Sequence, residues 1–102
     1  MENFKEPWEA PSDESQSARY EKELSREIPQ GHILVDRQVK AIARRMDRDD
    51  VLFLLDEGPQ VAVVHLTYSS ENLPEFPTTQ VYESLAEFEI LRMTPDHGEY
   101  SF

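Results

Sequence analysis

The spacing of apolar residues predicts two amphipathic helices, of which the first lies near the N-terminus. Tyr20, Leu24 and Ile28 recur at every fourth position and therefore form one apolar stripe on a helix over residues 13–27. Asp13 can cap the start of this helix, and a proline and a glycine follow its end. The stripe indicates a helix that packs on a core.

The second helix is predicted over residues 79–93. Val81, Leu85 and Phe88 form its apolar seam, and a threonine at its start can cap it. Pro95 is predicted to end it, because proline cannot continue a helical hydrogen-bond ladder.

Two apolar runs between these helices predict strands. Residues 51–55 are apolar throughout, which is typical of a central strand with both faces covered, and residues 61–67 alternate between two faces. A short turn with glycine joins them and predicts an antiparallel hairpin. Residues 34–46 are ambiguous, because their apolar positions fit a helix as well as a strand, with a slight edge for the helix.

Four segments together resemble the pattern of a family of small uncharacterised bacterial proteins, GHxL…VxxxARRxDxDDVLF…AVVHLTW with a proline-rich loop and a short acidic helix after it. The segments are Gly31-His32, Val39–Arg45, Asp49–Phe53 and Ala62–Thr67. The similarity extends over about residues 20–97 and implies no catalytic role. It implies that residues 38–45 form a strand rather than a helix. Members usually carry Trp where this chain has Tyr68.

These elements predict an α+β fold in the order α-β-β-β-α. A three-stranded antiparallel meander over residues 38–45, 51–55 and 61–67 packs against the two helices. Both faces of this sheet are apolar. Either the helices cover opposite faces, or a second copy of the chain covers one face in a homodimer.

The 102 residues correspond to one domain, which we expect over residues 12–102. Residues 1–11 contain two prolines among polar residues and are predicted to form a flexible N-terminal arm, from which Phe4 or Trp8 docks on the body.

The chain is strongly acidic, with a net charge of −11 from 21 acidic and 10 basic residues. This balance argues against binding to nucleic acids or to anionic membranes, because both need a basic surface. Half of the bases lie between Arg37 and Arg48. They either neutralise acidic neighbours or form a local anion or partner site; a nucleic-acid stripe of Lys40, Arg44 and Arg45 is the weakest hypothesis.

Several classes of chemistry are excluded by composition. The chain has no Cys, which excludes disulfides, thiol catalysis and Cys-ligated metals. Its longest apolar run has five residues, too short to span a membrane, and its N-terminus lacks the pattern of a signal peptide, so we expect a cytoplasmic protein. The three His are too far apart for a local zinc motif, and no glycine-rich phosphate loop occurs, so we expect no metal or cofactor.

One group of side chains could form a catalytic or ligand-binding site. It consists of His65, Asp49, Asp50, Arg45 and Tyr68, which a strand end and the adjacent turn could bring together. In the alternative interpretation, His65 is a hydrogen-bonded structural residue and the turn carboxylates pair with nearby arginines.

The loop before the second helix suggests a surface for a protein partner. Leu73 and Phe76 lie among acidic residues that include Glu75, and apolar side chains framed by carboxylates are common in interfaces. They could instead fold back onto the sheet. The leading hypothesis is a non-enzymatic interaction or regulatory module whose partner has a basic surface; the alternative is a small enzyme or ligand-binding domain around His65.

Overall fold

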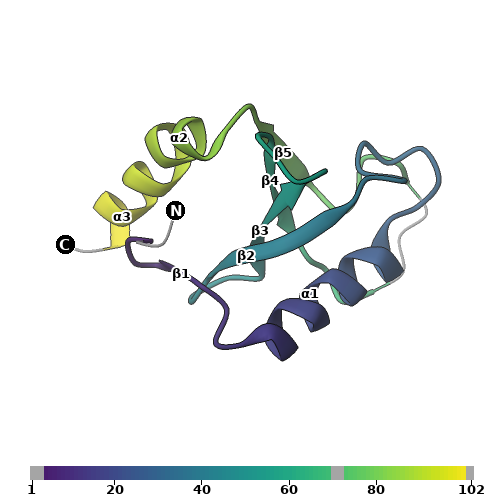
Figure 1. The fold of residues 1–102 in the computed structure, drawn as a ribbon, viewed down its shortest axis with the longest axis horizontal. Helices are drawn as coiled ribbons and strands as arrows, with labels where there is room; N and C mark the ends of the chain where they lie inside the picture. The colour runs from purple at the N-terminus through teal and green to yellow at the C-terminus, as the bar shows by residue number, and fades with distance from the viewer. Residues whose placement is uncertain (1–3, 70–72, 101–102) are drawn as a thin grey trace.

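The computed structural model describes residues 4–69 and 73–100. They form an α+β fold in which helices cover both faces of a five-stranded antiparallel sheet with the order β1-β2-β3-β4-β5 (Figure 1). The elements are β1 (Trp8–Glu9), α1 (Glu14–Glu27), β2 (Val39–Arg45), β3 (Asp50–Leu55), β4 (Val61–His65), β5 (Thr79–Tyr82), α2 (Leu85–Phe88), the π-helix η1 (Glu89–Met93) and α3 (Thr94–Tyr100).

Helix α1 begins where the sequence predicts. Asp13 Oδ1 accepts a hydrogen bond from the Gln16 N–H at 2.8 Å, and Gln16 Oε1 accepts one from the Ser12 N–H at 2.8 Å. These reciprocal bonds satisfy backbone donors that the first helical turn leaves free. On the predicted apolar stripe, Leu24 is fully buried against the sheet and Tyr20 packs beside it.

The prediction of three strands was wrong, because a further strand joins each edge of the meander. The segment expected to be an arm contributes β1, in which Trp8 pairs with Arg45. The start of the helix predicted over residues 79–93 is instead β5, which pairs with β4. Val81 and Tyr82 favour extended structure, and their strand satisfies backbone groups that β4 would otherwise expose at an edge.

The C-terminal helical segment therefore starts later than predicted and runs further. Ser84 caps it by accepting a hydrogen bond from the Glu87 N–H at 3.1 Å. The chain remains helical through Pro95, which we expected to stop it. In η1 the Thr94 N–H donates to the Glu89 carbonyl, five residues back. This wider turn lies directly before the proline, whose ring would crowd the preceding turn of a regular α-helix.

Two apolar cores lie on opposite faces of the sheet, so the two helical segments cover opposite faces. Helix α1 covers the first core, which contains Leu24, Leu34, Ala41, Val51, Phe53, Leu55, Ala62, Val64 and Leu66. Helices α2 and η1 cover the second core, which contains Trp8, Ala43, Leu52, Val61, Val63, Tyr82, Phe88 and Met93.

A β-bulge in β2 changes which face its residues point to. Ala41 pairs with Phe53 and Ala43 pairs with Leu52, so Ile42 is an extra residue in the strand. Ala41 consequently lies in the first core and Ala43 in the second, although strict alternation would place both on one face. The same reversal turns Arg45, two residues further on, toward the second core.

Candidate functional site

A buried ion-pair network lies at the edge of the second core. Asp96 Oδ2 accepts hydrogen bonds from Trp8 Nε1 at 2.9 Å and Arg92 Nε at 2.8 Å, and it lies 3.2 Å from Arg45 Nη1. Arg92 Nη2 also donates to Asp50 Oδ2 at 2.7 Å, and its guanidinium lies 5.6 Å from the centre of the Trp8 ring. One carboxylate thus connects β1 and β2 to the C-terminal helical segment.

The charges in this network are paired as burial requires. Arg45, Asp50 and Asp96 are only 5%, 4% and 8% exposed, and buried charges are tolerated when they are paired and hydrogen-bonded. Arg45 also makes two hydrogen bonds of 3.0 Å to Asp47, which lower the pKa of that carboxyl group. Burial acts to lower the pKa of Arg92. The pairing of Arg92 with Asp96 and Asp50 outweighs burial, so the pKa of Arg92 is raised overall.

His65 joins the network at its exposed end. Its Nδ1 lies 2.7 Å from Asp50 Oδ1, and its side chain is 55% exposed. The other Asp50 oxygen is occupied by Arg92. Within residues 4–69 and 73–100, the ring of His65 bonds to Asp50 and to no hydroxyl group that could serve as a nucleophile. The pair links β3 to β4.

The predicted cluster is divided between two places. His65 and Asp50 are bonded directly, and Arg45 reaches them through Asp96 and Arg92. Asp49 and Tyr68 instead line a cavity of about 100 Å³, which Asp50 borders as well. Its other lining residues are Tyr20, Arg44, Arg48 and Val51.

The sequence pattern does not indicate that Trp8, Arg92 and Asp96 belong to the network. Arg92 and Asp96 are four residues apart and would share a helix face, but a helix that ended before Pro95 could not present them together. The contact between Trp8 and Asp96 spans 88 residues, and no local pattern reports a contact of that separation.

The predicted partner loop lies beside a second loop. Leu73 and Phe76 are 54% and 39% exposed, and Ile33 of the neighbouring loop is 62% exposed. His32 ties the two loops together. Its Nδ1 accepts a hydrogen bond from the Leu34 N–H at 3.0 Å, so its Nε2 carries the hydrogen and donates to the Pro77 carbonyl at 3.0 Å. We call Ile33, Leu73, Glu75 and Phe76 the apolar loop surface.

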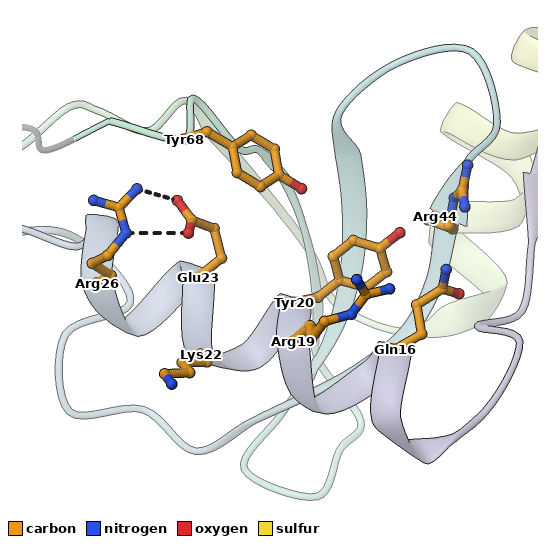
Figure 2. A pocket seen from close by; sticks show the side chains of 8 residues that line it. All are labelled: Gln16, Arg19, Tyr20, Lys22, Glu23, Arg26, Arg44 and Tyr68. Carbon is orange, nitrogen blue, oxygen red and sulfur yellow. Dashed lines mark hydrogen bonds and ion pairs between the residues drawn. The ribbon is translucent and has the colours of Figure 1, made fainter.

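A cavity of about 510 Å³ lies between α1 and the end of β4 (Figure 2). Helix α1 supplies most of its lining, Arg44 of β2 lies at one end, and Tyr68 comes from the segment after β4. We call it the tyrosine–arginine groove; its lining residues are Gln16, Arg19, Tyr20, Lys22, Glu23, Arg26, Arg44 and Tyr68.

The buried carboxylate of Glu27 fixes the position of Tyr68. Glu27 is 1% exposed. Its Oε1 accepts from the Thr67 N–H at 2.8 Å and the Thr67 hydroxyl at 3.0 Å, and its Oε2 accepts from the Tyr68 N–H at 2.7 Å. These bonds hold Tyr68 at a φ of 58°, a left-handed conformation that is unfavourable for an aromatic residue. Burial raises the pKa of Glu27, as does a hydrogen bond with Glu23.

We expect Glu27→Gln to lower the free energy of unfolding by about 1–3 kcal/mol, because an amide nitrogen would face one of the three donors and leave it unsatisfied. Denaturant titration of both proteins measures this loss.

The loss is also expected to depend on pH. Glu27 titrates near its ordinary value of 4.5 when unfolded and higher when folded, so the folded state binds the extra proton between the two values. The contribution of Glu27 to the free energy of unfolding is therefore largest below pH 4.5 and decreases as the pH rises through the pKa of the folded state. A deficit of the variant that grows with rising pH would contradict this interpretation.

No family model, curated protein or solved structure matches this chain. In the part of the chain that the structure describes, no helix has the length and apolar character to cross a membrane, and no cluster of three or more His, Asp or Glu side chains is arranged to hold a metal ion.

Proposed function

We propose that this chain is a non-enzymatic interaction module of the cytoplasm that binds a protein with a basic surface through the apolar loop surface. The observation that carries the proposal is the exposure of Ile33, Leu73 and Phe76, at 62%, 54% and 39%, on two loops that are tied together. Large apolar side chains on a fixed framework bind at a low entropic cost, because little of the surface must be ordered on association.

The charge of the chain favours a basic partner. The net charge of −11 accelerates encounter with a positively charged surface and repels acidic proteins. Exposed carboxylates occur on both loops, at Glu75, which lines a cavity together with Ile33, and at Asp36. Apolar contacts in the centre with charges at the rim are the usual composition of an interface.

The proposal is tested by affinity capture with the tagged chain, followed by calorimetry with the purified partner. We expect the double variant Leu73→Ser/Phe76→Ser to weaken binding at least about tenfold, because truncation of central apolar anchors removes most of the affinity. We also expect the association rate to fall between low and moderate salt, as electrostatic steering requires.

The matched control is Ile90→Ser/Leu91→Ser, which makes the same kind of change on exposed residues of η1. Binding by this control should equal that of the wild type. The proposal fails if the captured partner is acidic, if both double variants bind alike, or if the chain captures only its own copies.

A further inference from the structure

We propose that the tyrosine–arginine groove is a binding site for a small aromatic anion, specifically a nucleoside monophosphate. The groove lies on the α1 side of the sheet and shares no residue with the apolar loop surface. The inference therefore goes beyond the proposed partner binding and can fail independently of it.

The charge of the groove favours an anionic ligand. Arg19, Lys22, Arg26 and Arg44 line it, and among the residues that the structure describes Glu23 is the only acidic one in its lining. Glu23 is paired with Arg26 at 2.6 Å, so this pair contributes no net charge. Arg44 is paired with Glu9 at 3.7 Å, which leaves Arg19 and Lys22 as unpaired cations in the described part of a molecule whose net charge is −11. Such a local reversal of sign concentrates anions that the rest of the surface repels.

Two of these cations are free to bind a ligand, and a third is only loosely paired. Among the described residues, Arg19 and Lys22 form no ion pair or side-chain hydrogen bond, and Arg44 has a long contact of 3.7 Å to Glu9. By contrast, Lys40 on β2 is paired with Glu14 at 2.9 Å. A planar guanidinium donates two parallel hydrogen bonds to a phosphate group, and Arg19 and Arg44 offer such donors from two different elements.

The shape and the aromatic walls of the groove favour a planar ligand. Figure 2 shows the rings of Tyr20 and Tyr68 extending into the groove from opposite sides, with their hydroxyl ends turned toward the side on which Arg44 lies. Tyrosine rings stack on planar bases. We infer that the base contacts the tyrosine rings and that the phosphate lies toward Arg19 and Arg44.

The volume of the groove favours a nucleotide over a smaller phosphorylated ring. Sites for small ligands commonly have volumes of about 300–1,000 Å³, and this groove has about 510 Å³. At its Arg44 end, it shares Tyr20, Arg44 and Tyr68 with the adjoining cavity of about 100 Å³. This space accommodates a base, a ribose and a phosphate together.

Isothermal titration calorimetry with AMP tests the inference, and adenosine, inorganic phosphate and O-phosphotyrosine are the comparison ligands. We expect AMP to bind with a Kd below about 1 mM, which is accessible to this method. Adenosine and phosphate should each bind at least about tenfold more weakly, because each engages only one half of the groove. The AMP affinity should decrease with added salt.

Two variants probe the two halves of the site. Arg19→Gln and Tyr68→Ala should each weaken AMP binding at least about tenfold, because one removes a charged donor and the other removes a stacking surface. Arg37→Gln is the control. It changes the net charge by the same amount as Arg19→Gln, and Arg37 pairs with Asp56 outside the groove. Its AMP affinity should match that of the wild type.

Arg19 is exposed and has no partner among the described residues, so its replacement should leave the melting temperature unchanged and keep the test independent of folding. The inference is overturned if AMP does not bind at millimolar concentration, if O-phosphotyrosine binds more tightly than AMP, or if Arg19→Gln and Arg37→Gln have equal affinities. None of these results depends on whether the apolar loop surface binds a protein.

Discussion

Replacement of Asp96 by Ala is expected to lower the free energy of unfolding by about 3–5 kcal/mol, because it removes one partner of a buried ion-pair network. Arg45, which is 5% exposed, would lose its buried counter-charge, and Trp8 Nε1 would lose its acceptor. Small domains are stable by only about 5–15 kcal/mol, so this loss is large. Chemical denaturation at neutral pH measures it.

Asp47→Ala is the matched control for this prediction. Asp47 pairs with the same arginine through two hydrogen bonds of 3.0 Å, but its side chain is 38% exposed. Exposed pairs contribute little, so we expect a loss below about 1 kcal/mol. Equal losses for the two variants would show that burial of the carboxylate does not determine its contribution.

The second large effect is expected for Phe88→Ala, with a loss of about 3–5 kcal/mol from the cavity that it leaves. Phe88 is fully buried, and its ring packs edge-on against Trp8 at 5.1 Å and Tyr82 at 5.9 Å. It holds α2 on the sheet, and no other residue of α2 is buried. Thermal or denaturant unfolding of the variant provides the measurement.

Ile90→Ala serves as the control, because Ile90 lies two residues further along and is 68% exposed. Truncation of an exposed side chain should change stability by no more than about 0.5 kcal/mol. If Phe88→Ala lowered the free energy of unfolding as little as this control, packing of Phe88 in the second core would not be what holds α2 on the sheet.

The parts of the fold that local chemistry determines could be predicted from sequence. Helix α1 follows from its apolar period and from the reciprocal bonds of Asp13 and Gln16. The central hairpin of β3 and β4 follows from two apolar runs around a tight turn.

The errors arose where distant parts of the chain compete with local preference. Residues 79–82 carry a helical period but form a strand, because β4 offers a hydrogen-bonding edge. A π turn lets the helix pass through Pro95, and sequence period does not report such a turn. The bulge at Ile42 likewise turns Arg45 toward the second core.

The tyrosine–arginine groove could be predicted only in part from sequence, for the same reason. The sequence indicates Tyr68 as a candidate site residue. Its proximity to Tyr20, Arg19 and Arg44 depends on the packing of α1 across the sheet, which no local pattern reports. The sequence does not indicate a buried role for Glu27, since a glutamate at the end of an amphipathic helix ordinarily faces water. Its burial follows from three donors in a segment 40 residues away.

The hydrogen bond between Trp8 and Asp96 has a consequence for how the molecule opens. It joins the first strand to the last helix across 88 residues. We therefore expect β1 and α3 to open together. When either element detaches, water reaches the Asp96 carboxylate, and the other element loses the hydrogen bond that holds it in place.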